Sequence, residues 1–275
     1  MALDHDSFDW MKLILKSSEK VQNTVKRIQS HGARTKVVGT GASGDKTLLA
    51  DREAEKILVD ALSKVSGVRI LSEESGEIGQ RGAELLAIVD PLDGSSNFER
   101  RIPFYCTSIA IVRGRRLADT RAALVRNLVT GDVYYAERGK GATKNGERIA
   151  TSETSNIREA ILGVDLSRTD EGTYASLARL ITSAKRQVHF GANALELCFL
   201  AEGMIDAFID VRNKTRIVDF AGGYLIAKEA GAVLSTKSGD KLLTRLEMKE
   251  RFSFVSSANP QLQKVILDAL KQRHP

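Results

Sequence analysis

The sequence is organised around one stretch, Leu85-Leu86-Ala87-Ile88-Val89-Asp90-Pro91-Leu92-Asp93-Gly94-Ser95-Ser96-Asn97-Phe98. Its first five residues are apolar, which predicts a buried strand with Asp90 at its end. Pro91 cannot donate a hydrogen bond to a β-ladder, so we expect the strand to stop there. Asp93 follows three residues after Asp90, and a tight turn can bring both carboxylates to one cation. The stretch therefore places two acidic side chains together at the end of a strand.

The residues after Asp93 suit the binding of an anion. Gly94 permits a positive φ and the close approach of another group. Ser95 or Ser96 can cap a helix that begins at Asn97, and free N–H groups at a helix start favour an anion. Hard cations such as Mg²⁺ take oxygen ligands and usually work through one or two carboxylates plus substrate phosphate. The stretch thus predicts a metal ion held against a phosphate, and the alternative is an ordinary Asp-Gly turn with a serine cap.

Three further acidic segments occur in similar settings. Glu73 and Glu74 follow a short predicted strand at 68–71, Asp219 precedes a run of small residues that reads as a helix start, and Asp51 lies ahead of a helical run. Each also has a simpler interpretation, respectively a solvated loop, a helix N-cap and a charge on a helix surface. Taken singly, none of them indicates a site.

The rest of the chain reads as alternating helices and strands in two α/β halves. Residues 8–29 and 48–63 are predicted helices, the first capped by Asp6 or Ser7. Strands are expected at 68–71, 85–90, 106–113, 121–127 and 132–136, and in the second half at 160–164 and 206–210, with helices at 171–184, at 193–203 and after Asp219. The polar stretch 151–156 is the best boundary. It gives an N-terminal half, 1–155, with most of the candidate metal ligands, and a C-terminal half, 156–275, with Asp219 and candidate substrate-side residues.

Together these motifs resemble the inositol monophosphatase family of Mg²⁺-dependent phosphatases. The acidic pair Glu73-Glu74, the run Asp90–Ser95 and Asp219-Phe220-Ala221-Gly222 occur in the family's order and at about its spacing. The likeness continues through 139–146, 193–197 and 229–232. Two departures are Ser72, where the family has Gly, and Ser95, where it has Thr. Ser95 keeps the hydroxyl but loses the methyl that restricts the rotamer. The resemblance implies an α+β fold, a layered α/β/α/β/α sandwich with the site between the halves.

The same resemblance implies roles for the acidic residues. Two or three Mg²⁺ ions are expected at each site. The implied ligands of the first ion are Glu74, Asp90 and the Leu92 carbonyl; those of the second are Asp90, Asp93 and Asp219; a third, weaker ion would use Glu74 and, through water, Glu73. Asp51 and the Ser95 hydroxyl, with Glu74, would orient and deprotonate the attacking water.

The implied substrate is a small phosphorylated molecule. The phosphate is expected at Gly94, Ser95 and Ser96. Three cations, Arg212, Lys214 and Arg216, precede Asp219 at a place where inositol-specific members usually carry a Glu. They either form a basic surface turn or meet a second phosphate. Further candidate residues are Thr47, Arg168 and Asn193.

Asp210-Val211-Arg212 looks like the archaeal-type members that hydrolyse both fructose 1,6-bisphosphate and inositol monophosphate. A dual-specificity phosphatase is therefore expected, with a nucleotide 3′-phosphatase or NADP phosphatase of the same family as the alternative. The resemblance also suggests a homodimer.

A competing interpretation comes from Gly39-Thr40-Gly41-Ala42-Ser43-Gly44, which fits the dinucleotide pattern G-x-G-x-x-G. An NAD(P)-binding protein would use this loop between a strand and a helix. Against it, Asp45-Lys46 replaces the small apolar turn expected where that helix packs, and Glu73 comes later than the roughly 20-residue offset of the acidic partner. We expect a mobile Gly-rich loop near the metal ions instead.

Composition excludes several other classes. The 275 residues carry a net charge of +6 with 5% aromatic residues, so the basic face interleaved with aromatics that nucleic-acid binding needs is not expected. No apolar run approaches the roughly 20 residues of a membrane span, and the polar, acidic N-terminus is unlike a secretory signal, which favours a cytoplasmic enzyme. Cys106 and Cys198 are predicted to be reduced core residues. The four His are scattered and none is clustered with Cys, so no zinc site is expected.

Overall fold

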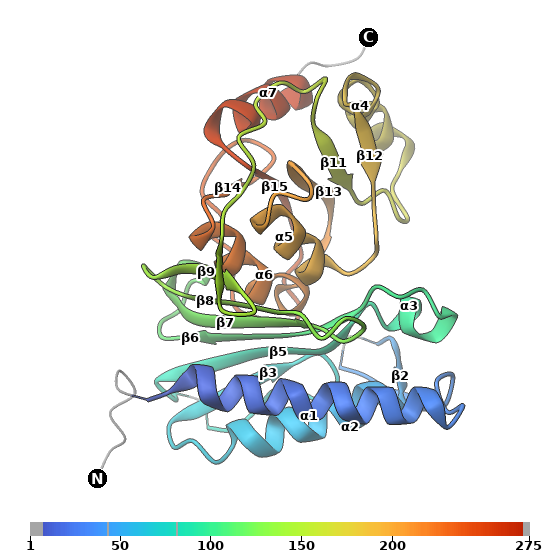
Figure 1. Ribbon diagram of the computed structural model, residues 1–275, viewed down its shortest axis with the longest axis vertical. Coiled ribbons are helices and arrows are strands. Elements are labelled where there is room, and N and C mark those ends of the chain that lie inside the picture. The colour runs from blue at the N-terminus through green and yellow to red at the C-terminus, as the bar shows by residue number, and fades with distance from the viewer. Residues whose placement is uncertain (1–7, 43, 81, 272–275) are drawn as a thin grey trace.

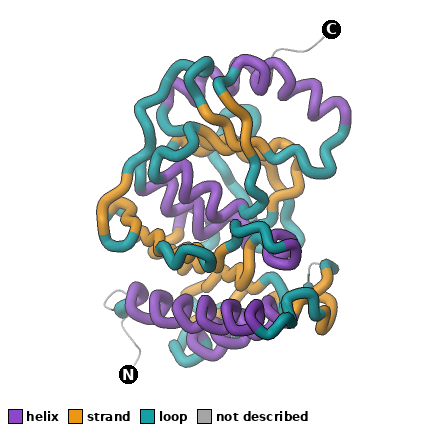
Figure 2. Tube along the Cα trace, turned by 45° about the vertical axis from the view of Figure 1, so that its right-hand side comes forward, coloured by secondary structure: helices purple, strands orange, loops and turns teal. Residues whose placement is uncertain are grey.

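The computed structural model describes residues 8–42, 44–80 and 82–271, and in that part of the chain helices and sheets alternate in five layers (Figure 1). Two helices cover one face of a large sheet, two more lie between this sheet and a smaller one, and two cover the far face of the smaller sheet. Figure 2 shows the middle helices between the two groups of strands. The predicted layered α+β fold is confirmed.

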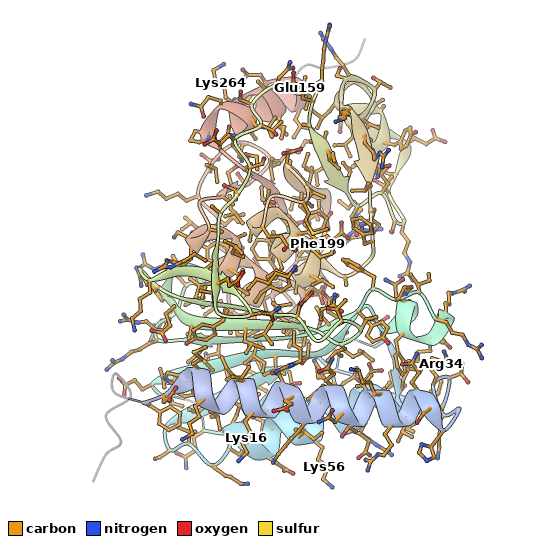
Figure 3. All side chains as sticks on the ribbon, in the orientation of Figure 1. Lys16, Arg34, Lys56, Glu159, Phe199 and Lys264 are labelled. Atoms are coloured by element: carbon orange, nitrogen blue, oxygen red, sulfur yellow. The ribbon has the colours of Figure 1, made fainter. Side chains whose placement is uncertain are left out.

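The outer layer beside the large sheet consists of α1 (Trp10–Ser30) and α2 (Leu49–Leu62). Apolar residues recur along one face of α1 at helical spacing, and Ile14, Val21 and Val25 are fully buried against the sheet. Lys16 and Lys56 extend from the opposite, exposed side of this layer (Figure 3). The side chain of Asp9 caps α1 by accepting a 2.9 Å hydrogen bond from the Lys12 N–H. The predicted caps Asp6 and Ser7 lie outside the described residues.

The large sheet has eight strands in the order β10-β9-β8-β7-β6-β5-β3-β4. Only β3 and β5 pair in parallel; the other neighbours are antiparallel. All nine residues of β5 are buried, as expected for a central strand covered by helices on both faces. The strands are β3 (Val68–Ser72), β4 (Gly76–Ile78), β5 (Leu85–Asp93), β6 (Cys106–Val112), β7 (Thr120–Asn127), β8 (Val133–Glu137), β9 (Gly141–Lys144) and β10 (Glu147–Ile149).

The middle layer is formed by α5 (Asn193–Ala201) and α6 (Ile217–Glu229). Both are apolar around most of their circumference because sheets or helices cover them on nearly every side. Gly223 allows the two helices to approach closely, since a Cβ there would lie 2.7 Å from the Leu197 Cβ. The first turns of these two helices therefore have fixed positions relative to the large sheet.

The smaller sheet has five strands in the order β12-β11-β13-β15-β14, with β11 parallel to β12 and β13. Its outer face is covered by α4 (Glu171–Ser183) and α7 (Pro260–Lys271). The strands are β11 (Ile161–Val164), β12 (Arg186–Val188), β13 (Ala207–Thr215), β14 (Val233–Ser235) and β15 (Phe252–Ser257). The remaining elements are a hairpin of β1 (Val37–Thr40) and β2 (Lys46–Leu48), the short helix α3 (Ser95–Arg100) and a 3₁₀ turn, Leu117–Asp119.

The structure corrects the predicted ends of three elements. Strand β5 does not stop at Asp90 but continues through Pro91 to Asp93, because its register with β6 shifts by one residue between these two acids and leaves Pro91 outside the regular ladder. Gly94, at φ +87°, precedes α3, and neither Ser95 nor Ser96 caps it. Asp219 is the third residue of α6 and not a residue before the helix.

No helix in the described part of the chain is both long enough and apolar enough to cross a membrane.

Candidate active site

Three carboxylates from different elements converge beside the end of β5. Oxygen atoms of Glu73, Asp90 and Asp219 all lie within 4.8 Å of one another. Glu73 follows the end of β3, Asp90 lies in the neighbouring strand β5, and Asp219 lies in the first turn of α6. Parallel pairing of β3 with β5 brings the first two together, and packing of α6 on the sheet brings the third. We call these three residues the acidic cluster.

Asp93 lies at the end of β5 and faces the start of α5. Its Oδ2 accepts a 2.7 Å hydrogen bond from the Ala194 N–H and lies 3.6 Å from the Cys106 Sγ, which is placed to donate to it. The first turn of a helix favours a negative charge. Asp93 is therefore held beside the acidic cluster by α5, whose own first residue is the predicted site residue Asn193.

The neighbouring residues Glu73 and Glu74 have different surroundings. Glu73 belongs to the acidic cluster, whereas the Glu74 carboxylate accepts a hydrogen bond from the Thr47 hydroxyl. Successive side chains at the end of an extended strand point to opposite sides. The sequence led us to expect a direct metal contact from Glu74 and an outer role for Glu73; the structure instead puts Glu73 among the clustered carboxylates.

The β1–β2 hairpin lies against Glu74. The Ala42 N–H donates to the Glu74 carbonyl at 2.8 Å, and a Cβ on Gly41 would lie 2.7 Å from the Glu74 Oε2. Lys46 in β2 forms an ion pair with Glu99 of α3, with its Nζ 2.6 Å from Oε2. The Gly-rich loop thus joins two antiparallel strands and is not followed directly by a helix. This geometry contradicts the dinucleotide-binding interpretation, which needs a strand, a turn and a helix in succession.

Asp51 is buried in the first turn of α2, where its Oδ2 accepts a 2.7 Å hydrogen bond from the Leu48 N–H. One turn further, Glu55 accepts hydrogen bonds from the N–H and the hydroxyl of Ser75, at 2.9 and 2.6 Å, and so holds the turn that follows the acidic pair. Glu55 was not among the residues predicted from the sequence. Its spacing of four residues from Asp51, on the same helix face, is the signal that could have found it.

Burial dominates the electrostatics of these groups. It raises the pKa of Asp51 to about 8 and that of Glu74 to about 7, with the neighbouring carboxylates adding to both shifts. Burial also raises the pKa of Glu73, and it raises those of Asp90 and Asp93 well above their ordinary values. Ionising all of these carboxyl groups together therefore requires positive charge among them.

The donor set fits a hard divalent cation. All of the clustered ligand atoms are carboxylate oxygens, the chemistry that Mg²⁺ prefers. The Asp90 Oδ2 is buried and has no hydrogen-bond partner among the described residues, so a lone pair there is available to a ligand. Leu92, whose carbonyl was predicted to join the first metal ion, is buried between Asp90 and Asp93 in β5.

Arg216 is the N-cap residue of α6 and points into the acidic cluster. Its Nη2 lies 2.7 Å from the Glu73 Oε1 and 2.7 Å from the Asp219 Oδ1, while its Nε lies 2.9 Å from the Asp219 Oδ2. Burial would lower the pKa of the guanidinium, but Asp219 and Glu73 outweigh this and raise it. The structure thus places this predicted substrate residue against two of the three clustered carboxylates.

Arg212, in the middle of β13, is held in a buried network beside the carboxyl end of β11. Its guanidinium pairs with Asp165 and, at 2.7 Å, with Asp210, and its Nη1 donates to the Ser167 carbonyl. The side chain is 9% exposed. His189 lies between Asp165 and Glu196, with nitrogen–oxygen distances of 3.4 and 2.9 Å. The sequence did not single out this network, because its members come from four separate elements.

The other predicted substrate residues lie nearer the surface. Lys214 is exposed, and its Nζ donates to the carbonyl of the equally exposed Arg168, which has a φ of +55°. Ser95 is partly buried and Ser96 is exposed in the first turn of α3. Lys214 and Arg168 are therefore cationic groups that a ligand can reach from solvent.

Asn97 links α3 to the start of α5, a connection the sequence did not reveal. Its Nδ2 donates to the carbonyls of Phe104, at 2.8 Å, and Phe190, at 2.7 Å. Phe190 packs with Phe104 and Phe199, and Figure 3 shows Phe199 in the middle of the molecule. The turn that precedes α5 is thus tied to the turn that follows β5.

This chain resembles known proteins of one family along nearly its whole length. Residues 10–274 match the model of the inositol monophosphatase family. A fructose-1,6-bisphosphatase/inositol-1-monophosphatase of Methanothermobacter thermautotrophicus is 34% identical, over 98% of this chain and 99% of the relative. A bifunctional NADP phosphatase/NAD kinase of Methanococcus maripaludis is 32% identical over 96% of this chain, but the chain spans only 50% of that protein.

Solved structures show the same architecture. One described as an inositol monophosphatase–fructose 1,6-bisphosphatase superposes with a TM-score of 0.84 at 32% identity, covering 95% of this chain and all of the other. The extragenic suppressor protein SuhB of Bartonella henselae gives a TM-score of 0.84 at 26% identity, covering 96% and 99% of the two chains.

Proposed function

This chain belongs to the inositol monophosphatase family of metal-dependent phosphomonoesterases, and we propose that it hydrolyses both fructose 1,6-bisphosphate and inositol 1-phosphate. The observation that carries the proposal is the convergence of Glu73, Asp90 and Asp219 beside Asp93, at the end of a buried strand. The similarity along the whole chain to a fructose-1,6-bisphosphatase/inositol-1-monophosphatase supports the choice of substrates.

In the proposed site Glu73, Asp90, Asp93, Asp219 and the Leu92 carbonyl hold two or three Mg²⁺ ions. When bound, Mg²⁺ neutralises charge on the phosphoryl oxygens and makes a water molecule easier to deprotonate. The fold itself positions the carboxylate ligands, because β3, β5 and the first turn of α6 hold them together without the metal. This limits the reorganisation that metal binding requires.

The proposed phosphate position lies at the turn between β5 and α3. Gly94 has a φ of +87°, and a Cβ there would lie 3.0 Å from the Phe104 carbonyl oxygen, so a side chain would be strained at this residue. The absence of a side chain lets a phosphate oxygen approach the N–H groups of Gly94 and Ser95. The Ser96 hydroxyl is exposed nearby and can add a further hydrogen bond.

Asp51, Glu74 and Ser95 are the proposed proton-handling groups. A general base works best when its pKa lies near the working pH, and burial raises the pKa of Asp51 to about 8 and that of Glu74 to about 7. In the proposal the Ser95 hydroxyl orients the attacking water and Asp51 takes its proton. Thr47 holds Glu74 in place by donating a hydrogen bond to it.

The second phosphate of a bisphosphate substrate is proposed to meet Lys214 and Arg168. These side chains are exposed, whereas Arg212 is occupied by Asp165 and Asp210. Arg212 is therefore assigned a supporting role, in which it fixes the end of β13 that carries Lys214. The predicted homodimer and cytoplasmic location stay predictions.

A panel of phosphate-release assays with Mg²⁺ tests the proposal. It compares fructose 1,6-bisphosphate, inositol 1-phosphate, NADP and adenosine 3′,5′-bisphosphate at matched concentrations. Comparable kcat/KM for the first two, with both abolished by EDTA and restored by Mg²⁺, is the expected result. The second candidate function is hydrolysis of NADP, which is favoured by the similarity to a bifunctional NADP phosphatase/NAD kinase, half of which this chain spans. Preference for either nucleotide would overturn the dual assignment.

A further inference from the structure

The guanidinium of Arg216 lies against two of the three carboxylates of the acidic cluster. One nitrogen, Nη2, lies 2.7 Å from both Glu73 and Asp219. A second, Nε, lies 2.9 and 3.1 Å from the two oxygens of Asp219. The third, Nη1, is buried and has no hydrogen-bond partner among the described residues; it lies 3.5 Å from the Asp45 Oδ2. The side chain is 17% exposed, so its charge is only weakly screened by water.

The acidic cluster needs such a charge when no metal ion is bound. Its carboxylate oxygens lie within 4.8 Å of one another, and burial raises the pKa of Glu73 and of Asp90, which disfavours the ionised forms of these two. Arginine stays protonated throughout the accessible pH range and binds carboxylates through a planar fork. A guanidinium at this position therefore stabilises the ionised cluster without metal.

We propose that Arg216 is a built-in counter-cation, which compensates Glu73 and Asp219 in the metal-free protein and competes with the metal ion that those two residues hold. This inference rests on the proposed function, because it concerns the same carboxylates. Binding of a divalent cation at Glu73 must move the guanidinium away or share an oxygen with it at short range. Either case costs electrostatic free energy, so Arg216 lowers the affinity of the site for metal.

The alternative role for Arg216, that of positioning the metal ligands, predicts the opposite effect of its removal. If Arg216 only positioned Glu73 and Asp219 as ligands, its removal would leave them misaligned and would weaken metal binding, as the loss of residues that orient metal ligands commonly does. The two roles therefore predict opposite changes in metal affinity for the same substitution. A measurement of affinity, and not of turnover, separates them.

The test is a titration of the full chain with Mg²⁺. Thermal unfolding and isothermal titration calorimetry measure the binding. Arg216→Gln is expected to lower the unfolding temperature of the metal-free protein and to decrease the Mg²⁺ concentration at half-saturation by roughly tenfold, the size of effect that an adjacent opposite charge has on a carboxylate. A Mg²⁺ requirement that is unchanged or higher would overturn the inference.

Arg216→Lys keeps the charge but loses the planar fork, so its Mg²⁺ requirement should fall by less than that of Arg216→Gln. If Arg216→Gln does not fold without metal, Arg216→Lys serves as the test. A Mg²⁺ requirement of this variant equal to or above the wild-type value contradicts the inference. Lys264→Gln is the control for net charge, because Lys264 is exposed on α7, at the far end of the molecule (Figure 3). A wild-type protein that shows no Mg²⁺-dependent stabilisation would instead contradict the proposed function.

Discussion

The N–H of Ala194 donates a 2.7 Å hydrogen bond to the carboxylate of Asp93, and this bond joins two residues that are 101 positions apart in the sequence. Asp93 ends the central strand of the large sheet, and Ala194 lies in the first turn of a middle-layer helix. The positive end of that helix favours the ionised form of the acid. The packing of α5 on the large sheet is therefore a part of the site's chemistry.

Asp93→Asn should abolish most Mg²⁺-dependent phosphate release while leaving the fold intact. The amide oxygen can still accept the Ala194 hydrogen bond, so packing is retained, but the charge that a metal ion requires is lost. We expect kcat/KM to fall by at least about 100-fold, with an unchanged circular dichroism spectrum. Asp268→Asn, at an exposed ion pair with Lys264, is the matched control. Activity within a factor of a few of wild type in Asp93→Asn would remove this residue from the proposed site.

Glu73→Gln and Glu74→Gln form a matched pair of neighbouring substitutions. Glu73 lies in the acidic cluster, whereas Glu74 binds the Thr47 hydroxyl. Glu73→Gln should therefore lose most of the Mg²⁺-induced rise in unfolding temperature, while Glu74→Gln should keep it and lose turnover instead. Thermal unfolding at increasing Mg²⁺ concentration measures the difference. Loss of the Mg²⁺-induced rise in Glu74→Gln but not in Glu73→Gln would show that Glu74 is the residue in direct contact with the metal.

Gly41→Ala tests the contact between the β1–β2 hairpin and the acidic pair. The added Cβ would lie 2.7 Å from the Glu74 Oε2, so either the hairpin or the Glu74 side chain must move. Misplacement of this kind should lower kcat by roughly tenfold or more. Gly39→Ala is the control, since no atom of the described residues lies within 4 Å of a Cβ there. Equal steady-state kinetics for the two variants would show that the hairpin does not position Glu74.

The contribution of His189 to the free energy of unfolding should depend on pH. Burial lowers the pKa of His189, but Glu196 and Asp165 outweigh it, in spite of nearby Arg212, and raise the pKa above the ordinary value of 6.5. Because the folded-state pKa is the higher one, the stabilisation is fully present below the unfolded-state value and is lost as the pH rises through the folded-state value.

The measurement for His189 is urea unfolding from about pH 6 to about pH 9, the range around a raised histidine pKa. The wild-type free energy of unfolding should decrease more over this range than that of His189→Gln. The glutamine variant retains a hydrogen-bonding side chain but cannot be charged. Parallel curves for the two proteins would show that His189 does not titrate with folding.

Lys214→Ala should raise the KM for fructose 1,6-bisphosphate more than the KM for inositol 1-phosphate, because only the former carries a second phosphate. We expect a selective rise of about tenfold, the equivalent of about 1.4 kcal/mol. Lys264→Ala, remote on α7, is the control. Equal effects on both substrates would place the second phosphate elsewhere.

Arg212→Ala, the substitution that the sequence suggests for the same purpose, should chiefly reduce stability. It leaves Asp165 and Asp210 buried without their partner, a change that typically costs about 3–5 kcal/mol. Chemical unfolding measures this loss directly. A variant as stable as wild type would show that Arg212 is free to bind substrate.

Where the signal was local, the chain pattern alone predicted the elements that hold the acidic residues of the candidate site. Asp90 and Asp93 were found because a buried strand is an uninterrupted apolar run, and its end is visible in the sequence. The elements around Asp51 and Asp219 were found in the same way, from helical periodicity. The end of β5 and the start of α6 were each misjudged by three residues, because a β-bulge and the packing of a helix decide where such elements end and begin.

Only the tertiary structure decided which groups meet. Whether Glu73 or Glu74 joins Asp90 depends on the direction of side chains where β3 ends, and a shift of one residue exchanges them. Arg212 and Arg216 look alike in the sequence, yet one is enclosed by Asp165 and Asp210 and the other reaches Glu73 and Asp219. Sequence periodicity records which face of an element is buried; the partners on that face come from strands and helices distant in the chain, and they are set by how the layers pack.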